Sequence, residues 1–379
     1  MPDVVFHAGG KKYSSIKELT ITKGLESLAH SFSFQMISDR SGSFPLKRGV
    51  SCFFEVDGKR FLTGYINQII ASFESKERTI EIQGRSRTAD LIDCSWTGES
   101  DEFKGEHSLW SVASILCQPF NINVLLENNI SDYKISNWKI DPGETIFESL
   151  ERMARSHGLF WQTDEYGNIF ICSVGKNRSD GVLIEGENIT KGNVSWDDSD
   201  QFSEYHCLIQ STSTYDDEPE FVPEEEEDKE KPETNEMGYT LAKTQIAEIA
   251  RDQTVKRFRP TVIFGEATPK NSDEAGSYAL QRAQWDAAVR HARSFKGELT
   301  VRGWYQTTGT LWKVNEVAFF TSPSLLVTSY ADVLITGVTF NRSVAQGNTT
   351  TVQITFPQAF KPQPAIVDKT DPASVALGY

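Results

Sequence analysis

Residues 51–69 read SCFFEVDGKRFLTGYINQI, and this stretch decides the fold class. Apolar and polar residues alternate on both sides of Asp57-Gly58, a dipeptide that favours a two-residue β-turn. The pattern therefore predicts a β-hairpin with one buried face. Similar short runs occur in residues 11–37 and 79–84, separated by turn residues. Together these runs suggest a small antiparallel barrel or sandwich, and we predict a β-barrel domain over residues 1–93.

The texture of the sequence changes after residue 93. Residues 108–120 place apolar side chains at helical spacing. Further on, Thr145 and Glu148 have the spacing of a capping box at the start of a second helix, and Gly158 is placed to end it. Short β-rich runs lie around these two helices. Residues 94–187 are therefore predicted to form a small α+β module.

A second β-rich region follows, and we expect a second barrel domain over residues 188–357. It is interrupted by an acidic stretch (212–240) and by a long predicted helix (273–295). Four prolines lie beyond Phe356, so residues 358–379 are expected to form an extended C-terminal tail. The predicted fold is mainly β with α+β: two similar antiparallel barrels, one small module and one long helix.

The two β-rich regions share a pattern that suggests an internal repeat. In each of them a strand is followed by a second strand that holds Thr-Gly, at Thr63-Gly64 and at Thr336-Gly337. A polar loop and a closing strand then follow in both. All-β chains also share such patterns by chance, so duplication stays one of two interpretations.

The charge of the chain is concentrated in one segment. The net charge is −15, and twelve acidic residues with two lysines lie between Asp216 and Glu236. The rest is only mildly acidic and lacks the basic surface that tight phosphate binding needs, which argues against a tight nucleic-acid-binding protein. The Pro- and Glu-rich composition predicts a solvated, disordered loop, with a site for a cation or a basic partner as the alternative.

Cysteine and histidine patterns give no sign of a metal site or a disulfide framework. The five cysteines are far apart with no CxxC pair, which favours reduced thiols in a protein folded in the cytoplasm. The six histidines form no ligand pair such as HExxH, so no metal and no cofactor is expected. The opening residues lack the pattern of a signal peptide, and no stretch approaches the ~18 apolar residues of a membrane span. The residues concerned are Cys52, Cys94, Cys117, Cys172 and Cys207, with His7, His30, His107, His157, His206 and His291.

Paired carboxylates are the remaining candidates for catalysis. Asp90 and Asp93 lie close in sequence, as do Glu148 and Glu151, and such pairs serve glycosidases. However, Glu148 already has the capping role, and the aspartates fall at a domain junction. The GxSxG, P-loop and GxGxxG patterns are also missing from the sequence. We therefore predict no catalytic residues.

Basic and aromatic residues suggest surfaces for contact. The basic residues around the long helix either form local ion pairs, such as Asp286 with Arg290, or line a subunit interface or a channel. The tryptophans are either core and interface anchors or a platform for a carbohydrate. The two sets are Lys256, Arg257, Arg259, Arg282, Arg290, Arg293, Lys296 and Arg302, and Trp96, Trp110, Trp138, Trp161, Trp196, Trp285, Trp304 and Trp312.

Four stretches resemble one known family, the baseplate hub proteins of phage Mu and the related 43 kDa tail proteins of Mu-like prophages. GRSRTADLIDCS (84–95) is the most specific of them. The acidic stretch looks longer and more charged than the family pattern, so the resemblance assigns it no role. The other three stretches are LTITKGLESLAHSFSFQM (19–36), ETIFESLERMARSHGLFWQTDEYGNIFI (144–171) and FRPTVIFGEAT (258–268).

This resemblance implies a structural subunit of a contractile phage tail. It implies a homotrimeric ring in which each subunit carries two like barrels, so that three copies adapt a six-fold tail tube to a three-fold spike. The partners would be the tube and spike proteins, with DNA passing through a central channel during genome ejection. The location would be the baseplate of the virion, after assembly in the host cytoplasm and without stable membrane insertion.

Two other classes of function stay open at the sequence level. A receptor- or carbohydrate-binding tail module is suggested by the eight tryptophans. A cell-wall-degrading tail enzyme would need the carboxylate pairs to meet in a cleft. The extended C-terminal residues are expected to be free to reach a neighbouring subunit or the spike.

Overall fold

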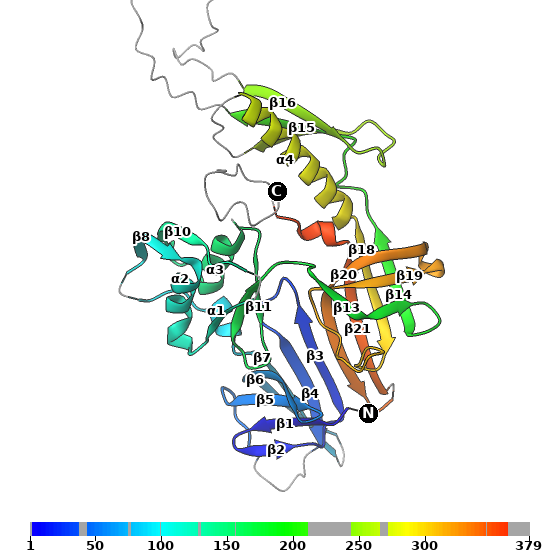
Figure 1. The fold of residues 1–379 in the computed structure, drawn as a ribbon. Coiled ribbons are helices and arrows are strands. Elements are labelled where there is room, and N and C mark those ends of the chain that lie inside the picture. Colours follow the sequence, from blue (N-terminus) through cyan, green and yellow to red (C-terminus); the bar gives the residue numbers. More distant parts are fainter. Residues whose placement is uncertain are drawn as a thin grey trace, which may run out of the picture. The chain divides into compact units, whose positions relative to one another are not determined.

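A computed structural model gives the arrangement of the chain (Figure 1). The predicted acidic loop lies outside the described residues, as does most of the predicted tail. The described part falls into two units, residues 1–197 with 292–362, and residues 198–291. The structure describes residues 2–37, 44–74, 77–98, 100–127, 130–155, 157–210, 244–265, 272–345 and 347–362.

The first unit contains a sheet whose first half comes from the N-terminal part of the chain. Every neighbouring pair in this half is antiparallel. The strand β2 (Lys11–Tyr13) extends it beyond β1. In spatial order the strands are β3 (Glu18–Gly24), β4 (Ser31–Ile37), β7 (Glu77–Ser86), β6 (Lys59–Glu74), β5 (Ser51–Val56) and β1 (Val4–Ala8).

The second half of the sheet repeats this order with later segments. All neighbours are antiparallel except the last pair, which is parallel. The repeated order confirms two similar β domains, and the mainly β class with few helices is also confirmed. The strands are β14 (Ile189–Trp196), β18 (Phe295–Arg302), β21 (Gly347–Thr355), β20 (Val327–Ser343), β19 (Glu316–Ser322) and β13 (Asn177–Ile184).

A β-bulge marks equivalent positions in the long strands β6 and β20. It falls between Ile66 and Gln68 opposite β7, and between Ile335 and Gly337 opposite β21. The extra residues are therefore Asn67 and Thr336. Because the dipeptide Thr63-Gly64 precedes its bulge whereas Thr336 is itself the bulge residue, the two Thr-Gly pairs are not equivalent. The repeat is present, but the sequence signal that suggested it is out of register.

The two halves are joined edge to edge into one sheet, and the ladders between the described strands do not show barrel closure. The strand β3 pairs with β20, with residues 19–24 opposite residues 337–342. Side chains from both halves belong to one buried core. At the joint, the rings of Phe61 and Phe340 meet edge to face with centroids 5.1 Å apart, and Trp304 lies 5.4 Å from Phe340.

Local sequence explains the hairpin that decides the fold class. Asp57 and Gly58 both have positive φ, 49° and 76°, and Val56 pairs directly with Lys59. This is the two-residue turn predicted from the dipeptide, with the backbone twist that suits antiparallel strands. On the buried face, Phe54 packs 4.9 Å from Phe6 between ring centroids. The alternation of the sequence therefore places an aromatic core on one face only.

The module after the first half of the sheet contains short helices and two small sheets. Thr145 and Glu148 form the predicted capping box, because the backbone N–H of each donates to the other's side chain at 2.8 and 3.2 Å. Gly158 has φ 63° just after the helix, as its predicted role requires. The elements are α1 (Ala89–Asp93), β8 (Glu102–Ser108), α2 (Leu109–Cys117), η1 (Gln118–Phe120), β9 (Val124–Leu126), β10 (Lys134–Lys139), α3 (Ile146–Arg155), β11 (Phe160–Thr163) and β12 (Ile169–Cys172).

The second unit is a three-stranded sheet with one long helix. The predicted ion pair between Asp286 and Arg290 is present at 3.0 Å. In the core of the second unit, Tyr205 and Cys207 of the central strand pack against alanines of the helix. The elements are β15 (Glu204–Gln210), which pairs with both β16 (Thr244–Arg251) and β17 (Pro260–Gly265), and α4 (Ser272–Arg293), whose last two residues belong to the first unit.

Two short 3₁₀ helices complete the first unit, η2 (Pro323–Leu325) and η3 (Pro357–Phe360). In η3, Ala359 is buried, and the ring of Phe360 packs on Phe160 with centroids 5.9 Å apart. The beginning of the predicted tail is therefore packed. The rest of the predicted tail, residues 363–379, lies outside the described residues.

Replacing Gly84 by alanine tests the packing at the centre of the first half. A Cβ there would overlap the Tyr65 carbonyl oxygen and the Phe32 ring. We expect a loss of about 1–3 kcal/mol in the free energy of unfolding, as for other overpacked cores, measured by urea unfolding. In contrast, Gly276→Ala meets nothing within 4 Å on α4 and should be neutral or slightly stabilising. Equal effects of the two changes would contradict this account.

Candidate assembly interface

The carboxylates considered for catalysis mostly have structural partners. Asp93 forms an ion pair with Arg85, and Glu151 forms one with Arg155 at 2.9 Å. Glu148 caps its own helix. Asp90 is half-buried, and this burial, together with the charge of Asp93, raises the pKa of the Asp90 carboxyl. The arrangement places these groups in helix ends and ion pairs.

The histidines occupy individual surroundings. His7 stacks on Phe53 with ring centroids 4.1 Å apart, and its Nε2 lies 2.8 Å from Glu55. His157 stacks on Tyr133 at 4.4 Å. His30 is buried, and this burial, reinforced by the Lys23 charge, lowers its pKa to about 3, so it is neutral near pH 7. Within the described ranges, no group of three or more His, Cys, Asp or Glu side chains could hold a metal ion.

The five cysteines are free thiols, and four of them are buried. Burial raises the pKa of Cys52, Cys117 and Cys172 to about 12. Since the thiolate is the reactive form, these side chains behave as small apolar residues.

Most of the tryptophans have partners inside the described fold. Trp161, Trp304 and Trp312 are at most 4% exposed. Trp110 and Trp196 are about half exposed, at 44% and 49%, and they lie on two separate elements, α2 and β14. An indole N–H donates to backbone oxygen in several cases, for example from Trp304 to Asn341 at 2.8 Å. The buried tryptophans, Trp161, Trp304 and Trp312, therefore serve as anchors of the core rather than as a shared flat platform.

The junction between the first half of the sheet and the α+β module is built on buried hydroxyl groups. The Thr88 hydroxyl is 2.9 Å from the Leu28 carbonyl oxygen and 2.7 Å from the Ser86 hydroxyl. The Thr163 hydroxyl, which comes from β11 in the module, donates to the same Leu28 oxygen at 2.6 Å. Ser86 in turn accepts the backbone N–H of His30 at 3.0 Å. The loop that contains Leu28 and His30 is therefore hydrogen-bonded both to the segment of Ser86 and Thr88 and to β11 of the module.

Side chains of Arg87 and Thr63 add further hydrogen bonds across this junction. Arg87 donates to the carbonyl oxygens of Phe120 and Asn121 at 3.1 and 2.7 Å. The Thr63 hydroxyl of β6 donates to the Glu165 carbonyl oxygen at 2.8 Å. Arg87 and Thr88, within residues 84–95, therefore have defined partners in the module. No sequence pattern assigned Leu28, His30 or Thr163 to this junction, because hydroxyl–carbonyl contacts over such separations leave no local pattern.

The joint between the halves of the sheet combines the ladder with polar pairs on its solvent side. Thr22 and Thr339 have hydroxyls 3.2 Å apart, and Thr20 donates to Asn341 at 3.3 Å. Lys23 donates to the Phe61 carbonyl oxygen at 3.0 Å and lies over the Phe61 ring. Burial lowers the pKa of this lysine to about 8, while the charges of Glu165 and Asp164 oppose that shift.

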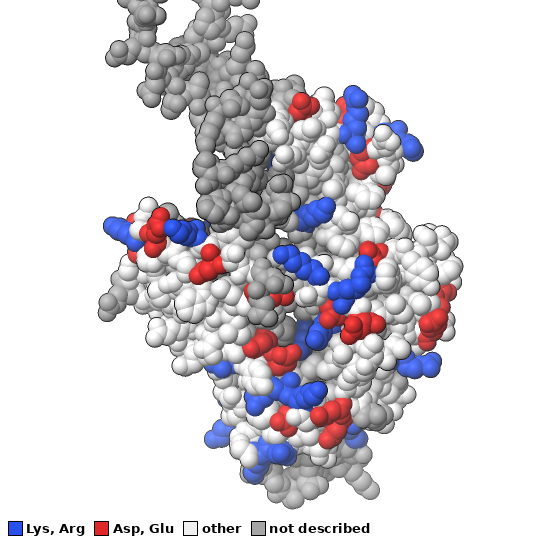
Figure 2. Space-filling model, in the orientation of Figure 1, with Lys and Arg blue, Asp and Glu red and all other residues white. Residues whose placement is uncertain are grey.

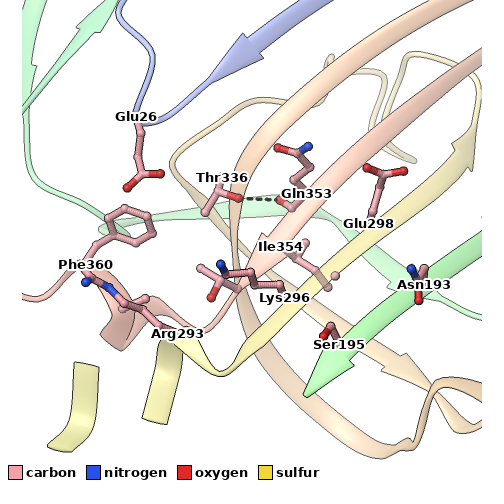
Figure 3. A pocket seen from close by; sticks show the side chains of 13 residues that line it. Glu26, Asn193, Ser195, Arg293, Lys296, Glu298, Thr336, Gln353, Ile354 and Phe360 are labelled. Atoms are coloured by element: carbon pink, nitrogen blue, oxygen red, sulfur yellow. Dashed lines mark hydrogen bonds between the residues drawn. The ribbon is translucent and has the colours of Figure 1, made fainter. Parts of the chain in front are cut away.

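A hollow of about 490 Å³ lies in the second half of the sheet, beside this joint (Figure 3). Glu26, Arg293 and Phe360 lie on one side of it, and Lys296 and Glu298 project from β18. The lining therefore mixes both signs of charge. Figure 2 shows the same mixture over the described surface that faces the viewer, where Lys and Arg alternate with Asp and Glu. Such a surface suits a protein partner better than a polyanion held tightly.

Family models match three consecutive parts of the chain. Residues 3–86 match "Mu phage baseplate assembly protein GpP-like, N-terminal", and residues 88–173 match "Baseplate hub protein gp44-like, second domain". Residues 275–363 match "Mu phage baseplate assembly protein GpP, fourth domain". A curated relative, the baseplate hub protein gp44 of Escherichia phage Mu, is 25% identical over 320 residues, which is 82% of this chain and 77% of that protein. The chain is therefore similar to the Mu baseplate hub protein along most of its length.

Solved structures of tail proteins share the fold of this chain. The 43 kDa tail protein of prophage MuSo2 from Shewanella oneidensis is 25% identical, with a TM-score of 0.75 over 96% of this chain and 100% of that one. The tail protein of Neisseria meningitidis MC58 has a TM-score of 0.71 at 20% identity, over 96% and 98% of the two chains. The role in a phage baseplate or tail inferred from the resemblance is therefore supported. Among the described helices, none has the length and apolar character to cross a membrane.

Replacing Thr88 by valine tests the junction with nearly constant side-chain volume. The change removes a fully buried hydroxyl that joins Leu28, Ser86 and Thr163. We expect a loss of about 1–3 kcal/mol in unfolding free energy, since the partners are left without it in a dry site. The control Thr308→Val alters an exposed hydroxyl and should change stability by less than about 0.5 kcal/mol. A neutral Thr88→Val variant in chemical denaturation would refute the role assigned to this network.

Proposed function

We propose that this chain is the structural hub subunit of a contractile-tail baseplate, and that three copies form a ring between the six-fold tube and the three-fold spike. The observation that carries this proposal is the repeated strand order in the two halves of one sheet. A subunit with two like halves supplies six similar units when three copies close around an axis. The same ring then matches a six-fold partner on one face and a three-fold partner on the other.

The surface chemistry supports a role in assembly. Both signs of charge are interleaved around the hollow beside the joint, so a protein partner is better matched than a nucleic acid. DNA in transit through a channel needs only weak contact, because strong phosphate binding would slow its passage. The tube and spike proteins are the proposed partners, in the baseplate of a virion assembled in the host cytoplasm.

The proposal assigns no catalytic step to the chain. The carboxylates of Asp93, Glu148 and Glu151 are engaged in an ion pair or a helix cap, which is a structural use of each group. A carbohydrate platform is less well supported, since Trp161, Trp304 and Trp312 are buried. The proposed function is therefore structural, and the residues after Pro362 are proposed to be available for contact with a neighbour or the spike.

The mass of the protein in solution tests the ring directly. One chain has a mass of 42.6 kDa, so a closed trimer should sediment with about three times that mass. The measurement is sedimentation equilibrium at micromolar to tens of micromolar concentration and moderate salt. A species that stays at one chain across this range would contradict the proposed ring.

A further inference from the structure

The strand β6 is longer than its partner on one side. Its neighbour β5 pairs with it only as far as Tyr65, whereas β7 pairs along the other side as far as Glu74. Val50 and Gly49 hydrogen-bond to Ile66, which extends the first side by one residue. Beyond the bulge, residues 68–73 have no ladder partner on this side among the described residues. The sheet therefore has an unpaired edge there.

The equivalent edge in the second half of the sheet is occupied. Counting from the bulge residues Asn67 and Thr336, residues 68–73 of β6 correspond to residues 337–342 of β20. Those residues of β20 pair with β3 of the same chain. The fold thus shows which kind of strand completes this edge: an antiparallel strand from the start of the other half.

The counterpart of β3 is β14, and it also has an open side. Val194 holds the place of Ile21. Across two neighbouring strands, Ile21 is in line with Ile66, the residue before the bulge in β6. Val194 is in line in the same way with Ile335, the residue before the bulge in β20. The strand β14 pairs with β18, and beyond its first residue no ladder partner is described on its other side. Each chain therefore presents one edge of the β20 type and one edge of the β3 type, and neither has a ladder partner among the described strands.

We propose that β14 of one copy pairs antiparallel with residues 68–73 of β6 in the next copy, repeating between subunits the pairing of β3 with β20. The register follows from the internal joint. Because Ile21 lies opposite Phe340, Val194 lies opposite Ala71, and Asn193 lies opposite Ser72. This inference rests on the proposed ring and states which backbone edges close it.

The side chains along the two edges fit this pairing. Residues 68–73 read QIIASF and carry no charge or proline, and Phe73 is 83% exposed in the single chain. An uncharged, apolar edge invites pairing with another strand, so natural proteins cover or charge such edges. In the proposed register Phe73 lies opposite Gly192, next to Leu325, and Trp196 lies opposite Ile69.

The pairing is heterologous, because the surface that β14 offers differs from the one that β6 offers. Such a contact forms a closed ring when the rotation between copies divides a full turn, and a filament otherwise. The internal joint already relates two like halves by the same kind of contact. Alternating internal and intersubunit joints then return to the first copy after three chains, which leaves no open edge of either type.

A pair of cysteines tests the register in the full chain. In a Cys94→Ser background, which removes the one partly exposed native thiol, Asn193→Cys with Ser72→Cys should form disulfides between copies under oxidised glutathione. Non-reducing gels should show linked dimers and trimers. The matched control is Thr20→Cys with Asn341→Cys, the equivalent internal pair, which should link within one chain and stay at the monomer position. The off-register pair Asn193→Cys with Gln68→Cys should give no linked species.

A charge on the edge gives a second readout. Ala71 is exposed in the single chain but lies opposite Val194 in the proposed joint, so Ala71→Asp should reduce the mass in solution about three-fold without unfolding the chain. Val344→Asp, at an exposed turn away from both edges, should leave the trimer intact. A trimer that persists in Ala71→Asp, or that links in the off-register pair and not in the predicted pair, overturns the edge pairing and leaves the proposed ring standing. A wild-type chain that stays monomeric overturns both.

Discussion

Pairing of β3 with β20 is the constraint on which the rest of the first unit depends. It joins residues 19–24 to residues 337–342, so the beginning and the end of the chain form one ladder. An unpaired backbone group in a buried edge costs about as much as a lost hydrogen bond, so neither strand is stable in its place without the other. Because Phe340 from one half and Phe61 from the other touch at this joint, the shared core also forms only when the halves meet. The two like halves therefore share one ladder and one buried core.

Attachment of the α+β module follows a different principle. The sheet edge ends in a segment where Gly84 admits no side chain and where Ser86 and Thr88 place hydroxyls in a dry junction. Each of these hydroxyls has more than one partner, and one of the partners, Thr163, belongs to the module. A fully satisfied polar network fixes orientation, whereas an apolar contact would tolerate sliding. The hydroxyl groups at the junction therefore fix how the module is oriented on the first half of the sheet.

Local signals in the sequence predicted local structure well. The Asp57-Gly58 hairpin, the capping box of Thr145 and Glu148, and the helix that became α4 each depend on residues that are close in sequence. Long-range pairing was not predictable in the same way, since no pattern in residues 19–24 indicates a partner more than three hundred positions away. The Thr-Gly resemblance failed because the two pairs lie four positions apart once the strands are aligned at their bulge residues, Asn67 and Thr336, and only the pairing reveals where the bulges lie. The same reasoning applies to η3, where packing of Phe360 overrides a proline-rich composition that suggested an extended tail.

The internal joint and the proposed intersubunit joint can differ chemically within one ring, because one forms within a single chain and the other forms when separate chains associate. The internal joint buries Ile21 against Phe340, and the covalent chain holds its two edges at a high effective concentration. The proposed intersubunit joint places smaller side chains, Val194 and Ala71, at its centre, and it must also offset the loss of translational and rotational freedom on association. A weaker joint between copies than within them keeps the ladder of the single chain intact while the ring forms and closes. Similar halves are therefore what a trimer that imitates a hexamer requires, and the rotation between copies decides whether the heterologous joint closes into a ring or continues as a filament.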